Sequence, residues 1–379
     1  MATAGAFSLR WVSSANEIPS ALWLKCFPPP LEGPWWYKVL ECSGLESQFT
    51  FAYGVIEQGA EPVGIAPTFL MDVPLDLVAP PLIVRVLRTT GRVLPGFRYQ
   101  RTVFIGSPCS DEGTVGLLPD VPLAEVAPLL QTALERRARQ VGASMIVWKD
   151  FPPTADAALT KLCTQRRLFK LVSYPGTRLL LPKGGFPAYV QALTSSHRHN
   201  LRKKLRRSKA LGDLHVSVLQ HPNSDVLLDI FTLFWQTYQK GKTKFERLTP
   251  QFFQHIAEEE VSYFVLLRHP ESNKLVAFML CFLIGSRVIN KFIGLDYSYR
   301  GDWFLYFRLW EQAVEWASGM QATELQSGQT GYGGKLDLGH ALIPLSNYCH
   351  HQNPVLHYLF ASIAQHISWQ TLDEDLAGR

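Results

Sequence analysis

The sequence predicts a mixed α/β (α+β) protein made of two lobes, each with a mixed, largely antiparallel sheet flanked by helices. Three observations lead to this fold class. The chain has 379 residues, too many for one ordinary hydrophobic core, so two lobes of roughly 150 to 200 residues are expected. A hydrophobic content of 47% and an aromatic content of 12% are typical of a globular protein with a large core. Finally, both halves show the same order of helical and strand patterns.

The first half starts with helical patterns and continues with strands. We expect helices near 14–25 and 34–43, a hairpin from about Gln48 to Met71 that turns at Gln58 and Gly59, a strand near Thr102 to Gly106, a helix from Leu123 to Val141 and a strand from Ala143 to Lys149. Residues 72–100, rich in Pro, Leu and Val, interrupt this order. They are expected to form an insertion or a binding loop.

The second half repeats this order. We expect helices near 223–239 and 250–259, a strand from Val261 to Leu267, a hairpin from Lys274 to Ile293 that turns at Gly285 and Ser286, a helix from about Asp302 to Ser318 and a further strand ending near Ser327. No letter-by-letter repeat is visible, so the duplication is inferred from element order alone. Proline-containing turns between residues 150 and 185 predict an N-terminal lobe over 1–170 and a C-terminal lobe over 171–379.

Cysteine usage and hydropathy indicate the compartment. The six cysteines are widely spaced and form no C-x-x-C pair, which is typical of reduced core thiols. The longest apolar run, Leu275 to Gly285, is much shorter than the ~20 residues of a membrane span, and the N-terminus lacks the apolar core of a signal peptide. A soluble, cytoplasmic protein is therefore expected.

The sequence lacks the motifs of several other functional classes. Cys349, His350 and His351 are adjacent, but neighbours on a strand point to opposite faces and no second ligand cluster is evident, so no metal site is expected. The sequence contains no G-x-G-x-x-G or P-loop motif, which argues against nucleotide hydrolysis and dinucleotide redox chemistry. It also contains no G-x-S-x-G elbow or catalytic cysteine signature, so a covalent acyl-enzyme is not expected.

One segment is strongly basic. Between Asp156 and Asp213 there is no acidic residue, whereas thirteen Lys and Arg residues lie there. Arg198, Arg202 and Arg206 share one face of a helical pattern that starts near Ser195 or Ser196, and Leu201 and Leu205 form an apolar i, i+4 pair on another face. A solvated basic helix is one interpretation. We favour a surface for a phosphate-bearing partner, because like charges without carboxylates at i±4 repel one another.

A second candidate anion site follows the predicted strand from Lys291 to Asp296. Gly301 opens the helical pattern just beyond this strand, and Gly319 closes it. The free amide groups and positive dipole end of a helix N-terminus bind a phosphate or another anion. Arg300 and Gly301 are therefore candidate ligands of such a group.

Several ordered motifs resemble the Fem-type tandem GNAT proteins, and most closely the bacterial peptidoglycan biosynthesis/recognition (FemAB-like) family and the related cellulose-biosynthesis-type acetyltransferases. The motifs are the basic run HRHNLRKKLRRSKALGDLHV, the segment FWQTYQKGKTKFERLTPQFFQHI, the hairpin and helix LVAFMLCFLIGSRVINKFIGLDYSYRGDWFLYFRLWEQAVEWASG and the closing loop LQSGQTGYGGKLDLGHALIP. The resemblance covers about residues 183–360 and is looser over 1–150. It implies two GNAT-like lobes and transfer of an activated acyl group to an amine.

The resemblance also implies roles for individual residues. Lys335, in a Gly-rich loop, matches the family's lysine and would stabilise an oxyanion or a phosphate, with a surface lysine as the alternative. Asp296 would act as a base or substrate ligand, or only shape a turn. Tyr306 lies where many GNAT enzymes place a tyrosine that protonates a leaving thiolate, although core packing is the favoured interpretation. Gln329 and Tyr332, in the same closing loop as Lys335, are implied donor ligands.

The sequence departs from the GNAT pattern at the donor turn. Enzymes that use acetyl-coenzyme A usually carry R/Q-x-x-G-x-G/A, whereas residues 300–305 here read RGDWFL and keep only Arg300 and Gly301. An acyl-CoA donor is therefore an expectation with an aminoacyl-tRNA as its alternative, in which case the basic segment would hold the RNA backbone. The expected acceptor is an amine of a small molecule or of a cell-envelope or polysaccharide precursor. A non-catalytic module of the same fold that binds a phosphorylated ligand is the other hypothesis.

Overall fold

The computed structural model describes residues 6–74, 99–241, 246–299 and 301–377. The chain folds into two compact units. Unit 1 consists of residues 1–28, 45–174 and 344–379, and unit 2 consists of residues 29–44 and 175–343. We had expected one division near residue 170, but each unit also receives a segment from the other half of the chain.

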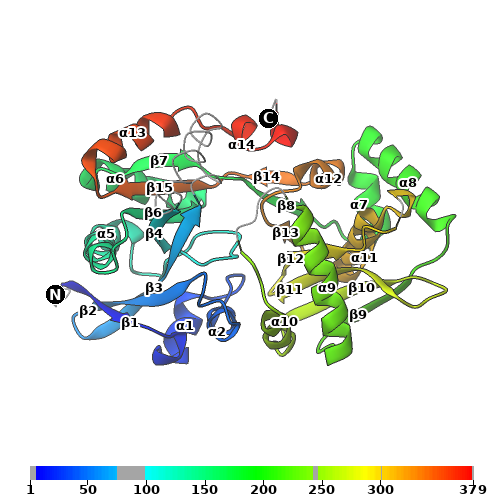
Figure 1. Ribbon diagram of the computed structural model, residues 1–379, viewed down its shortest axis with the longest axis horizontal. Coiled ribbons are helices and arrows are strands. Elements are labelled where there is room, and N and C mark those ends of the chain that lie inside the picture. Colours follow the sequence, from blue (N-terminus) through cyan, green and yellow to red (C-terminus); the bar gives the residue numbers. More distant parts are fainter. Residues whose placement is uncertain (1–5, 75–98, 242–245, 300, 378–379) are drawn as a thin grey trace, which may run out of the picture. The chain divides into compact units, whose positions relative to one another are not determined.

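Unit 1 contains a sheet with the strand order β1-β2-β3-β4-β6-β15-β7, and β5 pairs with β3 (Figure 1). All described neighbours are antiparallel except β4 and β6, which run parallel. The strands are β1 (Phe7–Val12), β2 (Thr50–Gln58), β3 (Glu61–Pro74), β4 (Tyr99–Ile105), β5 (Gly116–Leu117), β6 (Met145–Phe151), β7 (Phe169–Val172) and β15 (Ser346–His351).

Helix α5 (Leu123–Gln140) forms the main core of unit 1 because its apolar residues recur at helical spacing. Val126, Leu130 and Leu134 are fully buried on one face. Gln131 is buried on the same helix and accepts a 2.9 Å hydrogen bond from the Trp148 indole on β6. The other helices in the described part of this unit are α1 (Ser20–Cys26), α6 (Asp156–Arg166), α13 (Pro354–Ala364) and α14 (Trp369–Leu372), with short 3-10 turns at Ala15–Glu17, Pro153–Ala155 and Glu374–Leu376.

Unit 2 contains a seven-stranded sheet with the order β14-β8-β13-β12-β11-β10-β9. Its described pairs are antiparallel except β12 and β13, which run parallel. The strands are β8 (Gly176–Leu180), β9 (His215–Leu219), β10 (Ser262–Arg268), β11 (Leu275–Ile284), β12 (Arg287–Leu295), β13 (Glu324–Ser327) and β14 (Ala341–Ile343).

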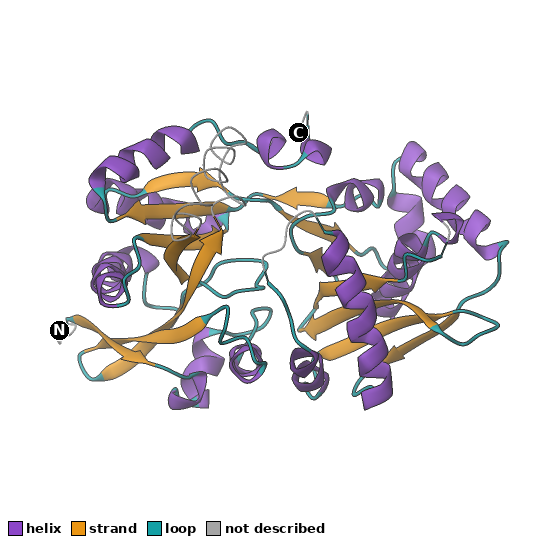
Figure 2. Cartoon of the chain, in the orientation of Figure 1, coloured by secondary structure: helices purple, strands orange, loops and turns teal. Residues whose placement is uncertain are grey.

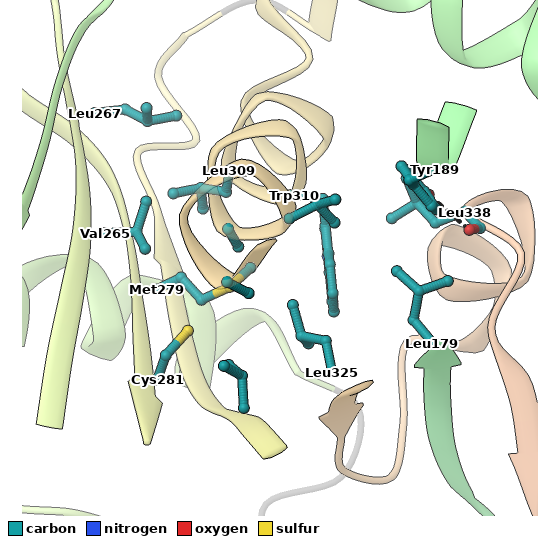
Figure 3. Close-up of a cluster of buried hydrophobic side chains, with 14 of the residues drawn as sticks. Leu179, Tyr189, Val265, Leu267, Met279, Cys281, Leu309, Trp310, Leu325 and Leu338 are labelled. Atoms are coloured by element: carbon teal, nitrogen blue, oxygen red, sulfur yellow. Dashed lines mark hydrogen bonds between the residues drawn. The ribbon is translucent and has the colours of Figure 1, made fainter. Parts of the chain in front are cut away.

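Helices cover both faces of this sheet (Figure 2). They are α2 (Pro34–Cys42), α7 (Gly185–Ala192), α8 (Ser195–Lys209), α9 (Ser224–Lys240), α10 (Pro250–Ala257), α11 (Leu305–Gly319) and α12 (Tyr332–Asp337), with a 3-10 turn at Gly301–Trp303. The central strand β11 is apolar throughout and nearly all buried, as expected of a strand covered on both faces. Its Met279 belongs to the core beneath α11 (Figure 3), whereas the ring of Phe278 packs 6.1 Å from Phe253 of α10.

The two units repeat one arrangement, which confirms the predicted tandem GNAT-like fold class. In unit 1, β2, β3 and β4 are antiparallel neighbours, α5 follows, and β6 then pairs parallel to β4. In unit 2, β10, β11 and β12 are antiparallel neighbours, α11 follows, and β13 pairs parallel to β12.

Local boundaries differ from several expectations. The helix expected near 14–25 is a 3-10 turn followed by α1, with Pro19 between them as the N-cap. The helix expected from Asp302 starts at Leu305, because Phe304 before it has a left-handed backbone (φ 43°). The expected insertion at 72–100 largely lies outside the described residues: β3 extends to Pro74 and β4 begins at Tyr99.

The described cysteines are free thiols, and Cys26, Cys281 and Cys349 are buried. Among the described helices, none has both the length and the apolar composition needed to cross a bilayer.

Candidate functional site

The parallel strands β12 and β13 of unit 2 pair only over a short stretch. The pairing runs from Arg287 opposite Glu324 to Asn290 opposite Ser327, where β13 ends. β12 continues to Leu295 beside β11, with a register shift between Leu280 and Cys281 that leaves Lys291 out of the ladder. The described pairing between β12 and β13 therefore stops inside unit 2, at Asn290 and Ser327.

Polar side chains lie where this pairing stops. The Asn290 amide donates a 3.2 Å hydrogen bond to Ser327 Oγ, and Thr177 Oγ1 donates a 2.7 Å bond to the Ser327 carbonyl. Asn290 is 5% exposed, and its Oδ1 has no hydrogen-bond partner among the described residues. Such a buried acceptor calls for an explanation. Sequence reasoning missed it, although an Asn inside the apolar strand RVINKF is a readable signal.

Lys335 lies near this point, but not in a loop as expected. It belongs to the short helix α12, which begins after Gly331 with a left-handed backbone (φ 64°). Its side chain is buried, and Nζ donates a hydrogen bond to the carbonyl of Gly328, the residue that follows β13. Nζ also lies 5.9 Å from the ring centroid of Tyr332. The structure therefore places an ammonium group next to the end of β13.

Tyr306 on the first turn of α11 packs against α12. A Cβ atom at Gly334 would lie 2.7 Å from Tyr306 Cε1, so the ring and the Gly334 backbone are in direct contact. Tyr306 Oη is buried without a hydrogen-bond partner of good geometry among the described residues, and burial raises the pKa of this phenol. The hydroxyl therefore keeps its proton at neutral pH, as a proton donor must.

Trp310 and His340 extend this cluster, and sequence reasoning missed both. Their rings meet edge to face with centroids 4.7 Å apart, and Trp310 Nε1 and both His340 ring nitrogens have no hydrogen-bond partner in the described part of the chain. The His340 backbone amide donates a 3.1 Å bond to the Lys335 carbonyl. Burial, with a smaller contribution from the Lys335 charge, lowers the pKa of His340 to about 3. His340 is therefore neutral at physiological pH.

The contacts of Asp296 favour the structural role over the catalytic one. Its carboxylate accepts hydrogen bonds from Lys274 Nζ at 2.7 Å and from the Ser298 amide and hydroxyl at 2.9 and 2.6 Å. Burial raises the pKa of Asp296, but these hydrogen bonds outweigh burial and hold it below its usual range. A carboxylate so engaged is a weak base, and here it closes the turn after β12.

The predicted donor ligands have different environments. Arg300 lies outside the described residues. Gly301 is exposed in the 3-10 turn before α11, and Gln329 is half-buried in the bend after β13. Tyr332 is fully buried, and its hydroxyl donates a 2.8 Å bond to the Pro175 carbonyl, so its side chain packs the core and presents no surface to a donor.

Helix α8 carries the basic run, and several of its cations have partners that are distant in sequence. Lys204 Nζ lies 2.7 Å from Asp337, Lys209 Nζ lies 2.9 Å from Glu311, and Arg207 pairs with Asp302. Arg198 donates hydrogen bonds of 2.9 and 3.1 Å to the carbonyls of Gln191 and Leu193. The expected charge repulsion is therefore partly offset within unit 2.

The remaining cations of α8 are available to a ligand. Arg202, Lys203 and Arg206 are exposed and form no ion pair with a described residue. Leu201 and Leu205 hold the opposite side of the helix in the core, as their i, i+4 spacing predicted. Of the three predicted phosphate ligands, Arg202 and Arg206 lie free on the surface and Arg198 is engaged with the backbone.

Comparison with known proteins agrees with this architecture. Among solved structures, FemX aligns with a TM-score of 0.57 at 11% identity, covering 93% of this chain and 100% of FemX. A tandem GNAT protein from the clavulanic acid biosynthesis pathway, solved without AcCoA, aligns with a TM-score of 0.52 at 12% identity, covering 92% of this chain and 99% of that protein. At such identities the likeness shows the fold alone. No curated protein matches the sequence. The family model for peptidoglycan biosynthesis/recognition, FemAB-like, matches residues 179–372, and the chain therefore belongs to the FemAB-like family.

Proposed function

We propose that this protein is an N-acyltransferase that joins an activated acyl group to an amine of a cell-envelope or polysaccharide precursor. The observation that carries this proposal is the end of the β12–β13 pairing at Asn290 and Ser327. Just beyond it, Lys335 Nζ contacts the carbonyl of Gly328, and Tyr306 packs against α12, the helix that carries Lys335. The acyl carbonyl of the donor would lie at this point.

The chemistry needs little beyond positioning and charge stabilisation. A thioester or aminoacyl ester is already activated, so attack by a neutral amine forms the new C–N bond and places negative charge on the carbonyl oxygen. Lys335 would stabilise this oxyanion after releasing the Gly328 carbonyl. The C–S or C–O bond to the leaving group then breaks, and Tyr306 would give that group its proton. The proton that the amine nitrogen loses on forming the amide would then restore the Tyr306 hydroxyl.

An aminoacyl-tRNA donor is the second candidate, and two features of unit 2 favour it. Arg202, Lys203 and Arg206 form an exposed basic stripe suited to a phosphate backbone. In addition, Asp302 in the turn before α11 takes up the charge of Arg207, at a place where a pyrophosphate of coenzyme A would need an unpaired positive charge. With this donor the reaction would be peptidyl transfer to a peptidoglycan precursor.

The direct test is mass spectrometry of ligands that co-purify with the protein, because coenzyme A, tRNA and a lipid-linked sugar differ unmistakably in mass. A purified protein that forms no amide product with any acyl-CoA or aminoacyl-tRNA, and that still binds a phosphorylated glycan, would instead be a binding module.

The donor class is then tested with substitutions on α8. Arg202→Gln together with Arg206→Gln should weaken binding of tRNA and reduce the slope of log K against log[salt] by about 0.7 to 0.9 for each lost phosphate contact. Arg207→Gln is the matched control, since Arg207 lies on the same helix but already pairs with Asp302. Equal effects of the double variant and the control would remove the argument for tRNA.

A further inference from the structure

We propose that helix α13 docks the protein onto an anionic lipid bilayer by inserting its exposed apolar face into the headgroup region. This surface belongs to unit 1, whereas the site described above belongs to unit 2. The inference does not depend on the identity of the donor or the acceptor.

The distribution of side chains on α13 is the reverse of that on an ordinary surface helix. Val355 is 76% exposed, Tyr358 65% and Leu359 51%. Their spacing of three and four residues places them on one side of the helix. His357 is buried on the other side, with its ring 5.3 Å from Phe169 of β7. Figure 1 shows α13 beside β7 and β15.

The segment that forms this surface has no acidic residue, lysine or arginine. The sequence contains no Asp, Glu, Lys or Arg from Ser346 to Leu372, a range that includes both α13 and β15. A contiguous exposed apolar face of this kind marks an interaction site. Tyr358 adds an aromatic ring with a polar end, which suits the boundary between headgroups and acyl chains.

A cation lies beside this apolar face. Arg167, the left-handed residue (φ 52°) that ends α6, is exposed and forms no ion pair with a described residue. Arg167 lies two residues before Phe169, whose ring contacts His357 of α13, so its backbone is close to this helix. An apolar helix face with a neighbouring cation is complementary to a surface of anionic lipids.

The size of the surface favours a bilayer over a second copy of the chain. A stable protein interface takes about 20 to 30 residues from each partner. The exposed apolar face of α13 comprises four large side chains, namely Val355, Leu356, Tyr358 and Leu359. One helix face is enough for interfacial insertion, because the acyl chains close around it.

The test is co-sedimentation of the full chain with phosphatidylglycerol-containing vesicles and with phosphatidylcholine vesicles. The wild type should sediment with the anionic vesicles. Val355→Asp combined with Leu359→Asp should lower the bound fraction at least about tenfold, and Arg167→Gln should lower it less and only on anionic vesicles. Leu228→Asp is the matched control, because Leu228 is 63% exposed on α9 of unit 2, and it should bind as wild type.

Three outcomes would overturn the proposal. The first is that the wild type does not sediment with anionic vesicles, or that the double variant sediments as well as the wild type. The second is a concentration-dependent dimer of the wild type that the double variant loses, which would make a second copy the occupant. The third is a thermal midpoint of the double variant well below that of Leu228→Asp, which would mean that α13 is covered within the folded chain.

Discussion

The buried ion pair between Lys291 and Glu32 should be a main attachment of residues 29–44 to unit 2. Lys291 Nζ contacts Glu32 and lies 4.7 Å from the ring centroid of Trp36. The Lys291 side chain is 1% exposed and that of Glu32 is 13% exposed. Lys291→Met therefore leaves a carboxylate in a largely dry site.

The expected cost follows from this burial. Removing one partner of a buried pair destabilises a protein by about 3 to 5 kcal/mol, and the partial exposure of Glu32 favours the lower end, about 3 kcal/mol. Arg10→Met is the matched control, since the pair of Arg10 and Glu57 has side chains 54% and 26% exposed. That pair should contribute about 0 to 1 kcal/mol. Lys291→Met combined with Glu32→Leu should recover much of the loss, because both charges of the buried pair are then removed together.

Urea unfolding measures the size of the effect, and hydrogen exchange followed by mass spectrometry locates it. In Lys291→Met, peptides covering α2 should exchange faster, while peptides from β2 and β3 of unit 1 should keep their protection. A loss below about 1 kcal/mol, or faster exchange spread equally over both units, would refute this account of the attachment.

Three further predictions concern the candidate site. Lys335→Ala should lower turnover roughly 10²- to 10³-fold and leave the circular dichroism spectrum unchanged. Lys335→Arg should restore little activity, because the planar guanidinium group cannot replace a buried ammonium group. A wild-type rate for Lys335→Ala would argue against a catalytic role of Lys335. Tyr306→Phe should slow transfer from a thioester much more than transfer from an aminoacyl ester, and equal effects in single-turnover assays would argue against its role as proton donor. The pKa of His340 in the folded protein is about 3, below the ordinary value of 6.5. The unfolded chain therefore takes up a proton at this side chain before the folded protein does. The free energy of unfolding should fall by up to about 1.4 kcal/mol per pH unit as the pH drops from 6.5 toward 3. His340→Gln should flatten the dependence of the urea midpoint on pH over this range, and parallel curves for both proteins would contradict the assignment.

Much of the fold could be predicted because its signals are local. The apolar run of β11, the Gly285 turn and the helical spacing of α5 and α11 each depend on residues close in sequence. The order of these elements then indicated the duplication, and the motifs of the second half indicated the family. The i, i+4 pair Leu201 and Leu205 likewise identified the buried side of α8.

The candidate site was predictable only in part, because its geometry depends on distant segments. Lys335 was identified from its motif, but its burial on α12 depends on packing against β13 and α11. Tyr332 was expected to contact a donor and instead packs in the core. Asn290, Trp310 and His340 lie within the family motifs, but the motifs assign them no role. They became candidates through polar atoms that find no partner among the described residues.

The sequence by itself determined where helices and strands form and how basic α8 is, since periodicity and charge are properties of neighbouring residues. Only the tertiary structure decided which charges stay free. Lys204, Arg207 and Lys209 find carboxylates on Asp337, Asp302 and Glu311, roughly a hundred or more residues away. The same holds for segment 29–44, which joins unit 2, and for β15, which joins the sheet of unit 1. Burial and charge pairing act through space, so a pattern of near neighbours cannot encode them.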